Sequence, residues 1–370
     1  MSGGLKSPLQ KALRVQLLRW FAAVRRPFPW REEPTPYRVL VSEIMLQQTQ
    51  AIRVIDFFER WMARFPSFQA LAAASEADVI KTWEGLGYYS RARALHAIAT
   101  IVCSTYNGLL PSTSEELLAL PGIGPYTAGA LLSFAFHQRA IAIDANVARV
   151  LGRCFGEKDK KKLPALLNKL LPHDEPWKFL EALIELGALC CCRLPACTKC
   201  PIAAHCYSCA HPDLLAPPQP SQKIIRLFRD VCVFRYAASV LVVKRSGKTI
   251  MSGLHEFPFF ETMPEGRSPQ ELCDHIESTL HCTPVRILPM ASVTHSFTRY
   301  RATLYPAIVE VTSPFDFQDG LWMPPERLSD LPFSSGHRKV LQALRGFRPL
   351  SILVEGTVHV EPGDLKPFGS

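Results

Sequence analysis

The stretch Leu120-Pro121-Gly122-Ile123-Gly124-Pro125-Tyr126-Thr127-Ala128-Gly129-Ala130 lies between two helical stretches of this 370-residue chain. Gly122 and Gly124 permit a tight turn whose backbone N–H groups point outward, and the helix that follows adds the positive end of its dipole. Together these groups can hold a phosphate without a cationic side chain. We therefore predict two helices, at about residues 112–135, joined by a turn that binds a phosphate group. The alternative is an ordinary corner between two helices, because a lone Gly-x-Gly is common.

The residues around this turn are expected to be mainly helical, from about residue 8 to residue 210. Apolar residues recur at helical spacing in four stretches, and Gly, Pro and Asn punctuate the chain between them. These stretches are Leu13–Phe21, Val39–Trp61, Leu118–Phe136 and Phe179–Leu189. A chain of this length usually holds more than one hydrophobic core, so we predict a first, helical domain at residues 1–210.

The sequence after residue 210 has a different pattern. The proline-rich run Ala216-Pro217-Pro218-Gln219-Pro220 suits a stiff linker, which we place at residues 211–228. Stretches rich in β-branched and aromatic residues follow, with one helical stretch, Gln270–Leu280, among them. The β-type stretches are Val231–Tyr236, Ser239–Lys244, Val285–Val293 and Thr303–Val311. We predict an α+β domain at residues 229–346 and make no assignment for the tail, residues 347–370.

The composition is that of a folded protein, with 48% hydrophobic and 20% charged residues. The formal net charge of +9 favours a polyanionic partner, although many basic proteins bind no nucleic acid. No apolar run approaches the roughly 18–20 residues that span a bilayer, and the N-terminus has no signal-peptide core. We therefore expect a soluble, cytoplasmic protein without membrane contact, whose 12 cysteines are thiols or metal ligands.

Two carboxylates stand in contrasting settings. Glu43 lies within the apolar helical stretch Ser42–Gln50, where an unpaired glutamate is costly to bury. Asp144 follows the hydrophobic run Ala140–Ile143 at a position typical of a helix N-cap, where backbone N–H groups keep a carboxylate ionised. One protonated and one ionised carboxyl group suit hydrolysis of a glycosidic bond. The alternatives are a simple helix cap for Asp144 and a solvated or salt-bridged position for Glu43.

A cysteine pattern closes the helical part of the chain. Cys190, Cys197, Cys200 and Cys206 have the spacing C-x6-C-x2-C-x5-C, and four thiolates are the usual ligands of an iron–sulfur cluster. A zinc site with four cysteine ligands is the alternative. The remaining cysteines, which include Cys103, Cys154, Cys209 and Cys232, are expected to be packing residues.

Residues 120–130 resemble the helix–hairpin–helix signature of the superfamily that includes endonuclease III and the adenine DNA glycosylases. The resemblance covers about residues 10–210 well and the second domain more weakly. It implies a mainly α helix–hairpin–helix glycosylase domain with a [4Fe–4S] cluster loop at residues 190–206, followed by an α+β Nudix-like domain. The cysteine spacing favours Cys190 as the first cluster ligand, and this is the ligand that we predict. The alternative is Cys191, which the register measured from Leu186-Gly187-Ala188 favours.

The same resemblance implies roles for the polar residues. Ser42–Gln50 is similar to the glutamate-bearing helix of adenine glycosylases, so Glu43 would be the general acid toward adenine and Asp144 would stabilise the sugar cation. Tyr126 and Asn146 would complete the polar wall around that centre. In endonuclease III-like enzymes a lysine that attacks the sugar matches Tyr126, and a phenol cannot form that Schiff base. The resemblance therefore predicts a monofunctional enzyme that hydrolyses the bond.

Contacts with DNA are predicted in two places of the first domain. A base inside a duplex is out of reach until it is flipped. By the resemblance, Gln48 and Tyr88 are the wedge and strand-separating residues, and the alternative for their loops is simple aromatic packing. The pocket for the flipped adenine would be edged by Phe28, Trp30 and Arg31.

The second domain resembles the Nudix-like domain of adenine glycosylases in Leu241–Arg245 and Gly253–Pro258. No run of metal-binding glutamates follows Pro258, which implies recognition without hydrolysis. The family's Phe-Ser-His loop, which reads 8-oxoguanine, corresponds here to Phe297-Thr298-Arg299. The hydroxyl is kept and the histidine is replaced by arginine. The alternative for this segment is a plain strand turn.

Together these features predict a monomeric base-excision repair enzyme, associated with the nucleoid, that removes adenine opposite 8-oxoguanine or guanine in double-stranded DNA. One rival is an endonuclease III-type bifunctional pyrimidine glycosylase with lyase activity, against which Tyr126 and Glu43 argue. The other is a non-catalytic iron–sulfur protein that binds DNA.

Overall fold

The structure, a computed structural model, describes residues 7–215, 224–246 and 251–346. The chain divides into two compact units, one formed by Met1–Thr82 with Ser90–Pro220 and the other by Trp83–Tyr89 with Ser221–Ser370. The proline-rich run at residues 216–220 and the tail at residues 347–370 lie outside the described residues.

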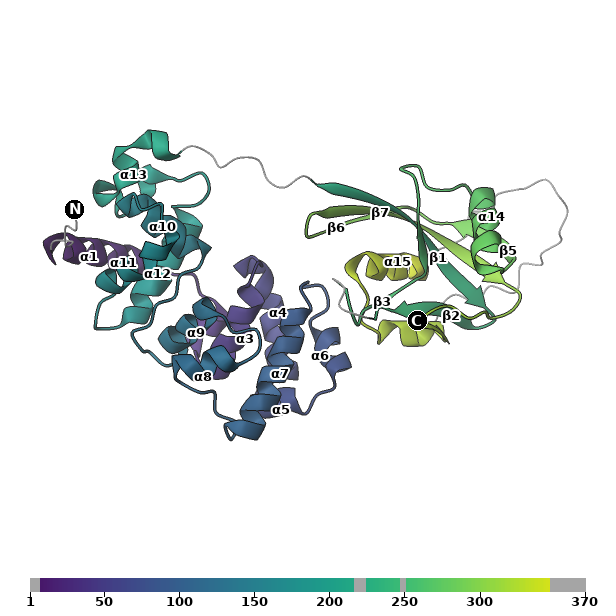
Figure 1. The fold of residues 1–370 in the computed structure, drawn as a ribbon, viewed down its shortest axis with the longest axis horizontal. Helices are drawn as coiled ribbons and strands as arrows, with labels where there is room; N and C mark the ends of the chain where they lie inside the picture. The colour runs from purple at the N-terminus through teal and green to yellow at the C-terminus, as the bar shows by residue number, and fades with distance from the viewer. Residues whose placement is uncertain (1–6, 216–223, 247–250, 347–370) are drawn as a thin grey trace. The chain divides into compact units, whose positions relative to one another are not determined.

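The first unit is helical, as the apolar spacing predicted (Figure 1). A π-helix, η1 (Leu131–Ala135), directly follows α9, and short 3-10 turns lie at residues 160–162, 197–199, 203–205 and 212–215. Its α-helices are α1 (Ser7–Val24), α2 (Pro29–Glu32), α3 (Pro36–Leu46), α4 (Ala51–Arg64), α5 (Phe68–Ala72), α6 (Glu76–Thr82), α7 (Ser90–Thr105), α8 (Ser114–Ala119), α9 (Pro125–Ala130), α10 (Ala145–Phe155), α11 (Leu163–Leu170), α12 (Pro176–Leu189) and α13 (Tyr207–Ala210).

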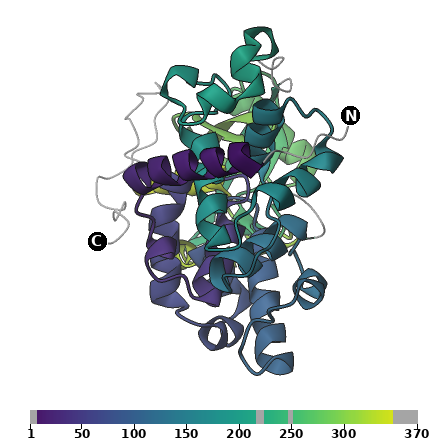
Figure 2. The ribbon, with the colours of Figure 1, turned by 90° about the vertical axis from the view of Figure 1, so that its left-hand side faces the viewer.

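A hydrophobic core forms where α1, α10, α11 and α12 meet, and α1 lies against α12 (Figures 1 and 2). The apolar face of α12 consists of side chains that are at most 1% exposed and recur at helical spacing: Phe179, Leu180, Leu183 and Leu186. Each such burial contributes about 1.5–3 kcal/mol. This core fixes α12 and the start of α10, which carry much of the site described below.

The apolar stretch Val39–Trp61 is two helices and not one, because α3 ends at Leu46 and α4 begins at Ala51. The buried guanidinium of Arg91 donates to the backbone carbonyl oxygens of Ile44, Met45 and Gln47 at 2.6–3.0 Å. These carbonyls are the groups that the end of a helix leaves without partners. Gln48 then takes a left-handed backbone conformation, with φ of 56°. The apolar spacing predicted the buried face but not the break, since the capping cation lies far away in the sequence.

The second unit is built on a mixed sheet of eight strands in the path order β3-β2-β1-β7-β5, where β4 pairs with β1, β6 with β7 and β8 with β2. Two helices, α14 (Pro269–Leu280) and α15 (Ser335–Gly346), and a 3-10 turn at residues 325–329 complete it. The strands are β1 (Ile225–Tyr236), β2 (Ser239–Lys244), β3 (His255–Glu256), β4 (Phe259–Glu261), β5 (Pro284–Pro289), β6 (Val293–Phe297), β7 (Tyr300–Val311) and β8 (Gly320–Met323). The predicted α+β class is confirmed.

The two faces of this sheet pack on different helices. Val231 and Val233 of β1 lie in one cluster with residues of α15, whereas Cys232 and Phe234 lie in another with residues of α14. This alternation is the period-2 pattern of a strand buried on both faces. β1 and β7 are parallel neighbours from Ile225↔Tyr300 to Arg235↔Glu310, which places the β6–β7 turn beside the start of β1.

Candidate active site

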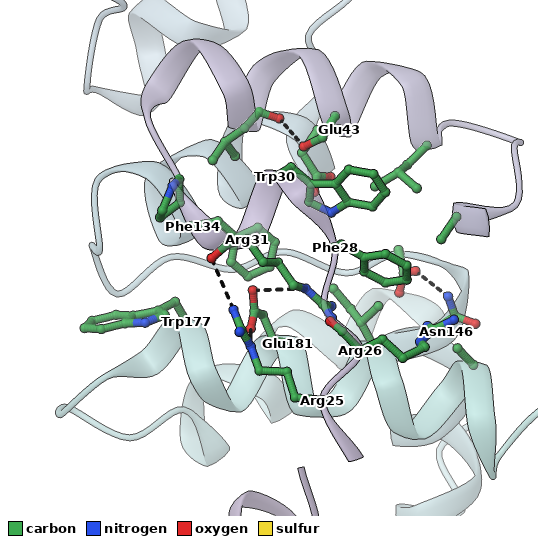
Figure 3. A pocket seen from close by; sticks show the side chains of 18 of the residues that line it. Arg25, Arg26, Phe28, Trp30, Arg31, Glu43, Phe134, Asn146, Trp177 and Glu181 are labelled. Atoms are coloured by element: carbon green, nitrogen blue, oxygen red, sulfur yellow. Dashed lines mark hydrogen bonds and ion pairs between the residues drawn. The ribbon is translucent and has the colours of Figure 1, made fainter. Parts of the chain in front are cut away.

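A cavity of about 1320 Å³ lies within the first unit. Its walls come from α1, the segment from α2 to the start of α4, α9, η1, the start of α10 and one face of α12 (Figure 3). Eight residues named from the sequence line it together: Phe28, Trp30, Arg31, Glu43, Gln48, Tyr126, Asp144 and Asn146. The fold thus brings distant segments of the chain to one place.

Glu43 lies on α3 and is only 7% exposed. Burial raises the pKa of its carboxyl group to about 7, a hydrogen bond with Tyr126 acts in the opposite direction, and the nearby charge of Asp144 raises it again. Its Oε2 is buried and has no hydrogen-bond partner among the described residues. The side chain is therefore an acid that can hold a proton near neutral pH.

Tyr126 is the second residue of α9 and is packed against the core of the first unit. Burial, followed by the charges of Glu43 and Asp144, raises the pKa of its phenol well above the ordinary value. The phenol therefore stays protonated and donates its hydrogen bond to Glu43. It can position that carboxyl group but cannot act as a nucleophilic amine.

Asp144 is the N-cap of α10, as its sequence position predicted. Its Oδ1 accepts a hydrogen bond from the backbone N–H of Val147 at 2.7 Å, and its Oδ2 accepts one from the Asn146 amide at 2.8 Å. Both bonds hold the carboxylate in one orientation. The capping bonds thus fix a carboxylate that lines the cavity.

Arg149 connects this carboxylate to the cysteine loop, and sequence reasoning missed it. Its Nη2 donates to Oδ1 of Asn146 at 2.7 Å and to the carbonyl oxygen of Gly187 at 2.8 Å. Its Nε donates to the carbonyl oxygen of Cys191 at 2.6 Å. The arginine at i+3 from Asn146 was the available signal, but its partners on the loop could be found only from the fold.

A second charged network builds the wall around Phe28 and Trp30, whose rings stack at 4.7 Å. Arg31 lies 4.9 Å from the Phe28 ring, and its guanidinium is ion-paired with Glu185 at 2.7 Å and Glu181 at 3.4 Å. Glu185 is fully buried and also pairs with Arg26 at 2.8 Å. Arg31 therefore acts as part of the wall. The two glutamates, four apart on α12, were not singled out from the sequence.

The hairpin between α8 and α9 has the predicted tight turn, but its two glycines differ. Gly122 has φ of 77°, and a Cβ there would lie 2.9 Å from the Cβ of Ala94. Gly124 has φ of −100°, and a Cβ there would meet nothing within 4 Å. The left-handed conformation therefore requires glycine at 122 only, whereas the backbone at 124 is open to an approaching group.

The two predicted insertion residues share an unusual backbone conformation. Gln48 and Tyr88 are exposed, and both have left-handed φ angles, of 56° and 50°. Non-glycine residues rarely adopt this region, and such outliers concentrate at functional sites. Gln48 belongs to the first unit, whereas Tyr88 belongs to the second.

The cysteine loop gathers several thiols around one small cavity. Its lining includes Arg153 and six cysteines: Cys190, Cys191, Cys197, Cys200, Cys206 and Cys209. Within the part of the chain that the structure describes, no three His, Cys, Asp or Glu side chains are arranged, as they stand, to hold a metal ion. Cys190 is 7% exposed and its thiol donates to the carbonyl oxygen of Lys199 at 3.7 Å, whereas Cys191 accepts from Arg153 at 3.6 Å.

In the second unit, Thr298 and Arg299 form the two-residue turn between β6 and β7, flanked by the pair Phe297↔Tyr300. Both turn residues are exposed, and Thr298 has a left-handed φ of 48°. The Phe297 ring stacks between His295 and Tyr300, at 5.2 and 5.4 Å. The predicted recognition segment is thus the tip of a β-hairpin, and stacked aromatic rings flank its turn.

Each of the two units matches the model of a known protein family. Residues 41–173 match the model of the HhH-GPD superfamily of base excision DNA repair proteins, and residues 230–343 match the NUDIX domain model. A solved thermostable thymine-DNA glycosylase is 30% identical, with a TM-score of 0.53 over 55% of this chain and 98% of that one. The fold and the site thus define a base-excision DNA glycosylase of the helix–hairpin–helix class.

Curated relatives show which family of this class the chain belongs to. An adenine DNA glycosylase of Mycobacterium tuberculosis is 40% identical over 59% of this chain and 75% of its own length. The adenine DNA glycosylases of Rattus norvegicus and Homo sapiens are 31% and 30% identical over 91% of this chain, and over 78% and 75% of their own lengths. The chain belongs to the adenine DNA glycosylase family. Among the described residues, no helix is long and apolar enough to cross a membrane.

Proposed function

We propose that this DNA glycosylase hydrolyses the N-glycosidic bond of adenine opposite 8-oxoguanine or guanine, without a lyase step. Family membership supports adenine removal in base excision repair. The observation that carries the rest is the arrangement of Glu43, Tyr126 and Asp144 in one cavity. This arrangement supplies an acid, a positioning phenol and an ionised carboxylate at the same centre.

The reaction needs a proton on the leaving base and a negative charge near the sugar. Glu43, with its pKa raised to about 7, can donate the proton to a ring nitrogen of the flipped adenine. Asp144 is fixed by hydrogen bonds to Val147 and Asn146, and its charge can stabilise the oxocarbenium-like sugar. Water adds to the sugar carbon as the carbon–nitrogen bond breaks, which leaves free adenine and an abasic site.

A lyase step requires an amine at the sugar, and the residue at the candidate position is Tyr126. The lysine that lines the described cavity, Lys178, lies near the start of α12 and is ion-paired with Glu175 at 2.5 Å. Asn146 marks the end of the cavity that holds the candidate catalytic residues, which we call the catalytic end. It lies at the far end of the cavity from Trp177, the neighbour of Lys178 (Figure 3). These positions support hydrolysis over Schiff-base chemistry.

The cysteine loop suits a [4Fe–4S] cluster, because six thiols and no carboxylate or imidazole line its cavity. Cys197, Cys200 and Cys206 would be three of the ligands. The fourth would be Cys190, as the spacing favours, or Cys191, since both thiols line the same cavity. When bound, the cluster would hold the loop in shape. Iron content and visible absorbance of Cys190→Ser and Cys191→Ser proteins separate the two, and stoichiometric zinc in colourless protein would exclude the cluster.

Recognition of the opposite strand is proposed for the β6–β7 tip. Phe297 offers a stacked ring, Thr298 a hydroxyl, and Arg299 an exposed cation that can contact the lesion or a phosphate. At the first unit, the open backbone of Gly124 and the outward N–H groups of the hairpin would bind a phosphate of the duplex. Gln48 and Tyr88 would fill the gap left by the flipped base.

The test is single-turnover release of base from duplexes with adenine opposite 8-oxoguanine, adenine opposite guanine, or thymine opposite guanine. We expect excision from the first two only, and no adduct on borohydride treatment. Glu43→Gln should abolish most activity, with the exposed Glu59→Gln on α4 as the matched control. Trapped enzyme–DNA adduct would favour the bifunctional alternative, and absence of adenine release would refute the proposal.

A further inference from the structure

The cavity extends well beyond the catalytic residues. Its volume of about 1320 Å³ exceeds the roughly 300–1,000 Å³ of pockets for drug-sized ligands, and adenine is smaller than such ligands. Along α12 the lining runs from Trp177 to Ala188, a rise of about 16 Å. Figure 3 shows Asn146 and Trp177 at opposite ends of this space, with Arg31 and Glu181 between them. One end of the cavity therefore lies away from Asn146.

Aromatic side chains gather at this second end. The ring of His137 stacks on Trp177 at a centroid distance of 4.2 Å and an angle of 27°. Phe134 lies on the same side of the cavity (Figure 3). His137 is exposed and Trp177 is half-buried, so the stacked pair is open to a ligand. Planar nucleobases stack on such surfaces whatever their sequence context.

The backbone around these rings is strained. His137 and Glu175 both have left-handed φ angles, of 54° and 47°, which non-glycine residues rarely adopt. The π-helix η1, which carries Phe134, ends two residues before His137. π-helical segments and backbone outliers are retained preferentially at functional sites. These features converge on the wall formed by His137 and Trp177.

Polar groups beside the rings suit the edge of adenine. The two carboxylate oxygens of Glu181 lie 3.4 Å from Nε of Arg31 and 3.5 Å from Nε of Arg25, so both ion pairs are long. A carboxylate held this loosely can still accept a hydrogen bond from an exocyclic amine. Arg25, with a side chain 41% exposed, can donate to a ring nitrogen.

We propose that the His137–Trp177 end of the cavity is a purine subsite that holds free adenine after excision. The proposal rests on the proposed function, because base removal is what delivers adenine into the cavity. The base would stack on the His137–Trp177 pair with its amine toward Glu181. The product would then be separated from Glu43 and from the abasic sugar.

Calorimetric titration of free adenine into the DNA-free protein tests this. We expect saturable binding to the wild type, a loss of about tenfold or more in affinity for Trp177→Leu, and a smaller loss for Trp177→Phe and His137→Ala. His173→Ala, an exposed change four residues before Trp177 and outside the cavity, should leave the affinity unchanged. His137→Ala removes an exposed ring and keeps the test possible if Trp177→Leu does not fold, as judged by circular dichroism.

Three results would overturn the subsite. One is no saturable binding of adenine to the wild type up to ~10 mM. Another is equal affinity in the wild type and all three ring variants. The third is binding that is lost in Glu43→Gln and kept in Trp177→Leu, which would place adenine at the catalytic end. Since the titration contains no DNA, failure here is distinct from failure to excise adenine from the mispaired duplexes.

Discussion

The catalytic end of the cavity and the β6–β7 tip place their polar groups in opposite environments. Glu43 is 7% exposed and its carboxyl group keeps a proton near neutral pH because it is buried. Thr298 and Arg299 are exposed, and what is unusual there is the backbone, which is left-handed at Thr298. Proton transfer needs a perturbed pKa, and therefore burial, whereas recognition of a second strand needs an accessible surface. Changes at the first region should therefore alter the rate of bond cleavage, and changes at the second should alter affinity and selectivity.

The largest effect is expected for Glu43→Gln, which keeps the shape of the side chain and removes the acid. Loss of a general acid typically lowers a rate by about 10²–10⁴-fold. Single-turnover release of adenine from a duplex with 8-oxoguanine, at saturating enzyme, measures this directly. Glu59→Gln should retain the wild-type rate. A Glu43→Gln enzyme within threefold of the wild type would remove the functional distinction between the two regions.

Arg149→Gln should have the next largest effect. It removes the hydrogen bonds that tie Asn146, and through it Asp144, to the carbonyls of Gly187 and Cys191. Changes to groups that orient a catalytic residue commonly cost about 10–100-fold in activity. The single-turnover rate and the iron content should both fall, with the exposed Arg19→Gln on α1 as control. A fall in iron content without a change in rate would show that the arginine supports only the loop.

The rate of excision should depend on pH through Glu43. The protonated carboxyl is the active form, so the single-turnover rate should be highest below pH 7 and fall about tenfold per pH unit above it. The pKa is raised on folding from its ordinary 4.5, so the contribution of Glu43 to stability is complete below about pH 4.5 and is lost as the pH rises through about 7. Glu43→Gln should thus gain stability relative to the wild type at pH 8 and not at pH 4, as measured by thermal unfolding.

The sequence predicted the two regions to different depths. The family resemblance named Glu43 and Asp144 as the candidate catalytic carboxylates, and Asp144 is the N-cap that the sequence indicated. The networks around them were not visible, since Glu185 of α12 pairs with Arg31 of α2, and Arg149 of α10 donates to the carbonyl oxygen of Gly187 on α12. The break between α3 and α4 was missed for the same reason, because Arg91 comes from another helix. The parallel pairing of β1 and β7 likewise depends on contacts between distant segments.

At the hairpin tip, Arg299→Ala should affect recognition and not chemistry. A lost charge-assisted contact costs about 1.5–3 kcal/mol when fully formed, and less at an exposed position, so we expect a three- to tenfold loss. The loss should appear in the ratio of dissociation constants for duplexes with 8-oxoguanine and with guanine opposite adenine. The single-turnover rate at saturation should stay within twofold of the wild type. An equal loss of affinity for both duplexes would assign Arg299 to a phosphate instead of the lesion.

The smallest effect is expected from relieving the strain at the same tip. In a two-residue hairpin turn, a positive φ at the first central position favours glycine, and Thr298 occupies that position between Phe297 and Tyr300. Thr298→Gly should remove the steric cost but increase the freedom of the unfolded chain, for a net gain of about 0.5–1 kcal/mol in the free energy of unfolding. It also removes the hydroxyl, so selectivity for 8-oxoguanine should fall while stability rises.

The Thr298→Asn variant separates these two effects. Asparagine tolerates the left-handed region and keeps a hydrogen-bonding group, so this variant should gain stability with less loss of selectivity. If Thr298→Gly gains stability and keeps the wild-type selectivity, the Thr298 hydroxyl does not contribute to recognition of 8-oxoguanine. The left-handed conformation of the turn would then be imposed by the strands alone.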